Sequence, residues 1–191
     1  MTNTKSQQKK IVILFSGEGS NMQRIIEEVS KHENIEVVAT ITNRKEAKGI
    51  ARLKPFNIPV NIIEHTQYDS REDFDQELVH RINYYNPDLV ILAGFMRILT
   101  PVFTQNVKSI NLHPSILPHF KGAKAIEQSF ENPDKPAGIS VHWVSEELDG
   151  GSVISQKELV RIEGEEFESF KNRIHLLEYE LLPSTVIQLL K

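Results

Sequence analysis

The sequence predicts an α/β fold: a single-domain, Rossmann-like open sheet that is mostly parallel, with helices on both faces and mixed strands near the C-terminus. Short, continuously apolar runs followed by glycine or polar residues are typical of strands buried in a parallel sheet. Between these runs lie segments whose apolar residues recur at helical spacing. The alternation of the two patterns indicates a sheet that helices cover on both faces.

The first half of the chain carries three repeats of this alternation. The expected elements are, in order, strand 11–15, helix 22–29, strand 35–41, helix 47–56, strand 60–63 and helix 70–85. Residues 11–15 are continuously apolar and precede Ser16 and Gly17, as expected of a buried strand. The last helix begins at a capping box, residues 70–73, and ends before Pro87.

The second half adds the strands that make the sheet mixed. The expected elements are strand 89–93, a short helix after Thr100-Pro101, strand 109–112, helix 124–130, strands 138–144 and 153–160, and helix 167–181. Ile139, Val141 and Trp143 alternate with polar residues, which predicts a strand with one covered face. We expect Pro183 to kink or restart the last helix.

Length and composition narrow the class of protein. At about 150 residues per domain, 191 residues correspond to roughly one domain, expected over 10–191 after a disordered tail at 1–9. The absence of cysteine excludes disulfides, cysteine zinc sites, iron–sulfur clusters and a cysteine nucleophile. The net charge of −4 shows no basic surplus for nucleic acid. Apolar runs of about five residues are far shorter than the roughly 20 that span a membrane, and no secretory signal is apparent, so we expect a cytoplasmic protein.

A loop with two glycines joins the first strand to the first helix, over residues 16–21. Backbone N–H groups at a helix start favour an anion such as phosphate. The dinucleotide fingerprint is incomplete, because Met22 stands at its third glycine and no ribose-binding acid follows the second strand. A mononucleotide or sugar-phosphate site is one interpretation. A tight turn with Ser20 or Asn21 as the helix cap is the other.

Asn111 and His113 end a predicted strand two residues apart, so their side chains point to the same side. Ligands of open α/β sheets bind at this end of the strands. An amide N–H beside an imidazole suits an oxyanion, although a polar strand end satisfied by backbone groups is the alternative. A carboxylate near His113, such as Asp149, is expected to raise its pKa. We expect His142 to be a surface or half-buried histidine, and the histidines show no metal-ligand spacing.

Four ordered segments resemble one known family. They are FSGEGSNMQ at 15–23, LAGFMRIL at 92–99, NLHPSILP at 111–118, and VHWV through LDGG at 141–151. In these segments the chain is similar to the glycinamide ribonucleotide formyltransferases, and the resemblance covers about 10–190. It implies the formyltransferase fold and transfer of a formyl group from 10-formyltetrahydrofolate to the amine of 5-phosphoribosylglycinamide, the third step of de novo purine synthesis.

The resemblance also implies site residues. It makes Asn111, His113 and Asp149 the catalytic trio, with Asn111 donating to the oxyanion and His113, held as imidazolium by Asp149, assisting proton transfer. The implied ligands of phosphoribosylglycinamide are Gly19, Ser20, Asn21 and Glu178. The implied ligands of the folate are Arg71, Met96, Arg97, Ile98 and Leu99, with Asn111 and Asp149. The folate is a co-substrate, and we expect no tightly bound cofactor, no metal, no nucleic-acid or membrane partner, and a monomer or homodimer.

Other functions remain as alternatives. Methionyl-tRNA formyltransferase shares the Asn-x-His signature but needs a further C-terminal domain, and formyltetrahydrofolate deformylase carries an extra N-terminal one. We expect a chain of 191 residues to leave no room for either. A formyltetrahydrofolate hydrolase or another folate-dependent formyltransferase is the alternative among enzymes. A folate- or nucleotide-binding module is the alternative outside enzymes, and binding alone does not need the trio of Asn111, His113 and Asp149.

Overall fold

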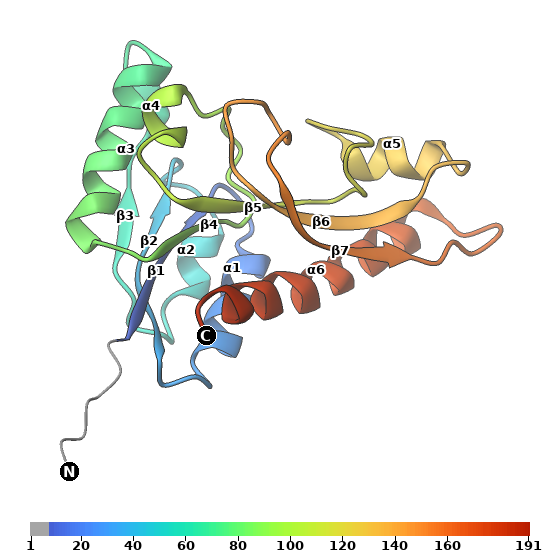
Figure 1. Cartoon of the computed structure of the whole chain (residues 1–191), viewed down its shortest axis with the longest axis horizontal. Coiled ribbons are helices and arrows are strands. Elements are labelled where there is room, and N and C mark those ends of the chain that lie inside the picture. Colours follow the sequence, from blue (N-terminus) through green and yellow to red (C-terminus); the bar gives the residue numbers. More distant parts are fainter. Residues whose placement is uncertain (1–7) are drawn as a thin grey trace.

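Seven strands form one sheet in the order β3-β2-β1-β4-β5-β6-β7 (Figure 1). The computed structural model describes residues 8–191. The strands are β1 (Lys9–Phe15), β2 (Ile35–Thr42), β3 (Val60–Ile62), β4 (Leu89–Leu92), β5 (Ser109–His113), β6 (Ala137–Trp143) and β7 (Val153–Leu159). The first five pair in parallel, and β6 and β7 are antiparallel. The predicted fold, a mostly parallel α/β sheet that becomes mixed near the C-terminus, is confirmed.

Helices cover both faces of this sheet (Figure 1). They are α1 (Ser20–Val29), α2 (Gly49–Arg52), α3 (Arg71–Tyr85), α4 (Pro101–Thr104), α5 (Ala125–Glu131) and α6 (Phe167–Leu189), with a 3₁₀ turn at His65–Gln67. Helices α1 and α6 pack together on one face, and α3 lies with α4 on the other. No helix within residues 8–191 has the length and apolar character needed to cross a bilayer.

Strand β1 shows why its sequence is apolar at every position. Ile11, Ile13 and Phe15 belong to the buried cluster that includes residues of α1 and α6. Val12 and Leu14 point to the opposite face and join the cluster that includes residues of α3. All five side chains are fully buried. A strand sandwiched between two helical layers has no solvent-facing side, so no polar residue interrupts the run.

Three local expectations differ from the structure. The helix expected over 47–56 shortens to α2, where the Gly49 N–H donates to the Gly17 carbonyl at 3.0 Å. Helix α6 continues through Pro183 and does not restart there, because the neighbouring Leu182 and Val186 are fully buried and their packing outweighs the local cost of proline. Strand β1 begins at Lys9, one residue before the predicted domain boundary, and residues 1–7 of the predicted tail lie outside the described residues.

The prediction that strand β6 has one covered face is wrong, because both of its faces are covered. On the side of Ile139 and Val141 it joins the core cluster that includes residues of α6. On the other side, the segment after β5 packs against it. There Ser140 Oγ donates to the Ser115 carbonyl at 2.7 Å and accepts from the Leu117 N–H at 3.0 Å. The polar residues that alternate along β6 therefore lie inside the protein.

Candidate active site

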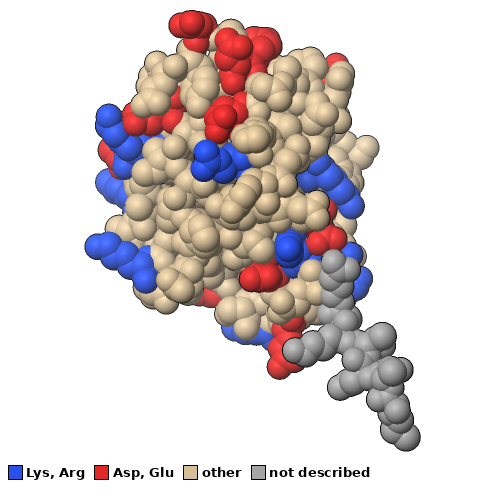
Figure 2. All heavy atoms as spheres, turned by 90° about the vertical axis from the view of Figure 1, so that its left-hand side faces the viewer, with Lys and Arg blue, Asp and Glu red and all other residues tan. Residues whose placement is uncertain are grey.

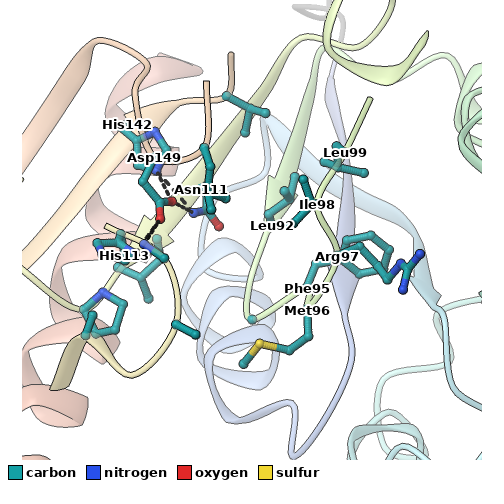
Figure 3. A pocket seen from close by; sticks show the side chains of 18 of the residues that line it. Leu92, Phe95, Met96, Arg97, Ile98, Leu99, Asn111, His113, His142 and Asp149 are labelled. Carbon is teal, nitrogen blue, oxygen red and sulfur yellow. Dashed lines mark hydrogen bonds and ion pairs between the residues drawn. The ribbon is translucent and has the colours of Figure 1, made fainter. Parts of the chain in front are cut away.

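A cavity of about 690 Å³ opens beside β4 and β5, a size typical of small-molecule sites. Four parts of the chain supply most of its lining: residues 94–99 after β4, 111–114 at the end of β5, 122–127 at the start of α5, and 144–149 between β6 and β7. The rest of the lining is Asn21 from α1, Leu92 from β4, His142 from β6, and His175 and Glu178 from α6. In Figure 3 a polar cluster stands on one side of the cavity and the segment 92–99 on the other.

The polar cluster contains the three residues that the sequence singled out. On β5, Ile110 and Leu112 point into the core, which leaves Asn111 and His113 together on the opposite side. The β6–β7 connection folds back so that Asp149 contacts both. His113 Nδ1 lies 3.3 Å from Asp149 Oδ2, and Asn111 Nδ2 donates to Asp149 Oδ1 at 3.3 Å. The interpretation of Asn111 and His113 as a polar strand end satisfied only by backbone groups is therefore wrong.

His142 is the residue of this cluster that the sequence analysis missed. It was expected at the surface or half buried, but only 2% of it is exposed. In the antiparallel register it stands opposite Asn111, and its Nε2 lies 3.2 Å from Asn111 Nδ2 and 3.4 Å from Asp149 Oδ1. Its Nδ1 donates to the Trp143 carbonyl at 2.9 Å, so Nε2 of a neutral ring accepts from the Asn111 amide. The strand pattern held no signal for it, because the alternation of His142 with the apolar side of β6 is the same observation that pointed to the surface.

The protonation of His113 also differs from expectation. Burial lowers the pKa of His113 below its ordinary value, although the charge of Asp149 and the Phe120 carbonyl pull the other way. Nε2 donates to that carbonyl at 2.8 Å, because a carbonyl oxygen only accepts. The expected upward effect of Asp149 on the pKa of His113 is present, but desolvation is the larger effect, so the net pKa is lowered and the ligand-free site does not favour the expected imidazolium.

Asp149 remains a carboxylate in this setting. Burial raises its pKa, but the contact with His142, the charge of His113 and the Gly122 N–H outweigh burial, so the net pKa lies below the ordinary value. The Gly122 N–H donates to Oδ2 at 2.8 Å. The site thus holds a fixed negative charge beside an imidazole that gives up a proton readily and that Asp149 stabilises whenever it takes one up.

The glycine loop reaches the cavity through one residue. Asn21 lines the cavity and donates from Nδ2 to Glu178 Oε2 at 2.9 Å, while Gly19 and Ser20 lie just outside the lining. Gly19 is the N-cap of α1, with φ +70° and no side-chain cap, so the interpretation of Ser20 or Asn21 as the helix cap is wrong. His175 Nδ1 contacts the same Glu178 oxygen at 3.0 Å, and this hydrogen bond raises the pKa of His175 although burial opposes it.

Residues 96–99, which the family resemblance implies as ligands of the folate, face the polar cluster across the cavity (Figure 3). Met96, Arg97, Ile98 and Leu99 all line it, with Met96 71% and Ile98 56% exposed. Arg71, the first residue of α3, is exposed and lies outside the lining.

On the face shown in Figure 2, basic side chains stand apart among neutral and acidic atoms. Within residues 8–191 no cluster of histidine and acidic side chains has the geometry of a metal site.

Comparisons with known proteins agree on one family. The family described as Formyl transferase matches residues 9–186. Phosphoribosylglycinamide formyltransferase of Escherichia coli (strain K12) is 39% identical over 92% of this chain and 84% of its own length. The Bacillus subtilis (strain 168) enzyme of the same name is 37% identical over 95% of both chains.

A solved structure gives the same result. The crystal structure of phosphoribosylglycinamide formyltransferase from Campylobacter jejuni is 49% identical and superposes with a TM-score of 0.94, covering 97% of this chain and 100% of that one. Sequence and structural similarity thus extend over nearly the whole length of the chain. The chain belongs to the formyl transferase family, in the branch of the phosphoribosylglycinamide formyltransferases.

Proposed function

We propose that this chain transfers the formyl group of 10-formyltetrahydrofolate to the primary amine of 5-phosphoribosylglycinamide, giving formylglycinamide ribonucleotide and tetrahydrofolate in purine biosynthesis. The observation that carries the proposal is the contact of Asn111, His113 and Asp149 in one cavity. A module that only binds its ligands has no need of a hydrogen-bond donor, a titratable imidazole and a carboxylate at one point.

The reaction needs stabilisation of one developing charge. The amine nitrogen attacks the formyl carbon, and the carbonyl oxygen becomes an oxyanion. Asn111 Nδ2 is the donor assigned to that oxygen. Its contacts to Asp149 and His142 are both long, at 3.3 and 3.2 Å, so the amide loses little when it exchanges one of them for a short, charge-assisted bond to the oxyanion. One oxyanion donor of this kind contributes about 10²–10³ in rate.

The reaction also moves one proton. The attacking nitrogen becomes positive and must lose a proton, and the folate nitrogen must gain one as its bond to carbon breaks. His113 suits this transfer because burial keeps its pKa low, so the imidazole is available as a base. Once protonated, its Nδ1 faces Asp149 Oδ2 at 3.3 Å, which holds the charge until the leaving nitrogen takes the proton. Atoms balance without a covalent enzyme intermediate.

The two substrates are assigned to opposite parts of the site. The start of α1, with Gly19, Ser20 and Asn21, is assigned to the substrate phosphate, and Glu178 to the glycinamide end. Residues 96–99 and 145–149 are assigned to the folate, with Arg71 on the same side. The folate is consumed as a co-substrate, and the assignment includes no metal. We include in the proposal one domain over 10–191, a cytoplasmic location, and a monomeric or homodimeric state.

Turnover of 10-formyltetrahydrofolate with and without phosphoribosylglycinamide tests this function. Tetrahydrofolate production that depends on the amine supports the transferase. Equal production without the amine identifies a hydrolase instead. Tight binding of both ligands without turnover identifies a binding module and overturns the proposal.

A further inference from the structure

The cavity wall formed by residues 94–100 has no regular secondary structure. Its backbone is fixed at two points by side chains from elsewhere in the chain. The Met96 N–H donates to Ser16 Oγ at 2.7 Å, and the Thr100 N–H donates to Asp75 Oδ2 at 2.6 Å. Residues 96–99, which line the cavity, lie between these two anchors. The shape of this wall therefore depends on two distant side chains.

The Ser16 anchor also belongs to the loop that begins α1. Ser16 is 1% exposed, and its hydroxyl donates to Asn43 Oδ1 at 2.6 Å while it accepts from Met96. Its own N–H donates to the Gly94 carbonyl at 3.0 Å. Because Ser16 directly precedes residues 17–21, one buried hydroxyl joins the loops that follow β1, β2 and β4. A displacement of the loop after β1 or of the loop after β4 therefore breaks the hydrogen bond between Ser16 Oγ and the Met96 N–H.

The Asp75 anchor belongs to the scaffold instead. Asp75 lies in α3 and is 1% exposed, and its Oδ2 accepts from both the backbone N–H and the hydroxyl of Thr100, at 2.6 and 2.7 Å. No residue of α3 lines the cavity. Asp75 thus holds the far end of the wall without contact to the loop at the start of α1.

We propose that Ser16 and Asp75 are positioning residues of the 96–99 wall, and that Ser16 couples the folate side to the phosphate side. The part that concerns substrates rests on the proposed function. A ligand that orders one of two loops sharing a hydrogen bond also orders the other, so the second ligand loses less conformational entropy on binding. Each substrate therefore tightens the binding of the other through Ser16, and Asp75 supports the folate side alone.

The variants are chosen to separate the two anchors. Ser16→Ala removes the shared hydroxyl, and Asp75→Ala removes the other acceptor. If Asp75→Ala folds poorly, Asp75→Leu removes the acceptor without leaving a cavity, and Asp75→Asn, which keeps an oxygen acceptor, is the conservative variant. Ser109→Ala is the matched control, because Ser109 is also a buried serine at 3% exposure, but its hydroxyl contacts only the Val107 carbonyl at 3.4 Å.

Hydrogen–deuterium exchange of the ligand-free protein tests the anchors whether or not the proposed function holds. We expect Ser16→Ala to speed exchange of the Met96 amide about tenfold, and Asp75→Ala to do the same at Thr100, as the loss of one hydrogen bond predicts. Asp75→Asn and Ser109→Ala leave both amides near the wild-type rates. Unchanged exchange at Met96 in Ser16→Ala overturns the Ser16 anchor, and unchanged exchange at Thr100 in Asp75→Ala overturns the other.

Calorimetry with tetrahydrofolate, alone and with saturating phosphoribosylglycinamide, tests the coupling, because this pair cannot react. In the wild type and in Ser109→Ala, we expect the second ligand to tighten tetrahydrofolate binding at least about fivefold. Ser16→Ala brings that factor close to one and raises KM for both substrates more than it lowers kcat. Asp75→Ala weakens the binding of tetrahydrofolate, but phosphoribosylglycinamide still tightens that binding by the wild-type factor. A wild-type factor retained in Ser16→Ala overturns the coupling, whereas failure of the wild type to bind either ligand overturns the proposed function.

Discussion

His142 stands directly opposite Asn111 on the neighbouring antiparallel strand, and its Nε2 lies 3.2 Å from the Asn111 amide nitrogen. The other ring nitrogen donates to the Trp143 carbonyl, which fixes the orientation of the ring. His142 therefore orients Asn111, the group assigned to the oxyanion, from the strand behind it.

Loss of this acceptor should slow the reaction without weakening substrate binding. In His142→Leu the buried Asn111 amide loses one partner, so we expect kcat to fall about tenfold with little change in either KM. His142→Gln offers a side-chain oxygen in its place and should recover part of the loss. Steady-state kinetics of both variants check this, and a large rise in KM with constant kcat would contradict an orienting role.

The charge of Asp149 opposes the effect of burial on His113, and its removal has a definite sign. In Asp149→Asn the pKa of His113 should fall further below its ordinary value, because desolvation then acts with less opposition. Activity should fall at least about 10²-fold, the scale of acid–base assistance. An NMR titration of the His113 ring in both proteins gives the shift. Superimposable titration curves would show that the pair does not interact.

A substitution at Gly19 tests whether the loop at the start of α1 binds the substrate phosphate. Gly19 has φ +70°, and a Cβ there would lie 2.7 Å from Gly49 Cα, so Gly19→Ala displaces the start of α1 and costs about 1–2 kcal/mol of stability. We expect this substitution to raise the KM for phosphoribosylglycinamide by a much larger factor than the KM for the folate. Gly17→Ala is the control, because nothing lies within 4 Å of its Cβ position. If Gly19→Ala melts early but keeps its KM for phosphoribosylglycinamide, the phosphate is held elsewhere.

Glu178 should control the titration of His175. Its hydrogen bond is the main cause of the raised pKa of His175, so Glu178→Gln should return that pKa toward 6.5. A histidine whose pKa is raised by folding stabilises the fold below its unfolded pKa, and this contribution disappears as pH rises through the folded pKa. The difference in the free energy of unfolding between the wild type and Glu178→Gln should therefore shrink as the pH rises through the folded pKa of His175. Denaturation curves at several pH values check it, and a difference that grows with pH would be the wrong sign.

Much of the fold could be predicted because its signals are local. The run from Ile11 to Phe15 has no polar position, and a strand covered on both faces is the direct explanation. The same local rule placed Asn111 and His113 on one side of β5. The capping box at Ser70 was equally readable, and the Asp73 N–H donates to Ser70 Oγ at 3.0 Å.

The rest depends on contacts between distant segments. His142 was expected near the surface because alternation in one strand shows that its faces differ, but not what covers the second face. That cover is the segment after β5, tied to β6 through Ser140. The low pKa of His113 has the same origin, because desolvation depends on every segment packed around the ring. The anchors of the 96–99 wall, Ser16 and Asp75, are likewise distant in sequence from the loop they hold.

The central claim is that Asn111, His113 and Asp149 carry out formyl transfer, and its most direct test follows the formyl carbon. Protein dialysed against a strong chelator is mixed with 10-formyltetrahydrofolate labelled in the formyl group and with phosphoribosylglycinamide, and the labelled product is identified by mass spectrometry. We predict that the label appears on the glycinamide amine in the wild type without added metal, and that Asn111→Ala slows its transfer about 10²–10³-fold. Label recovered as formate, transfer that returns only with added metal, or an undiminished rate in Asn111→Ala would contradict the account.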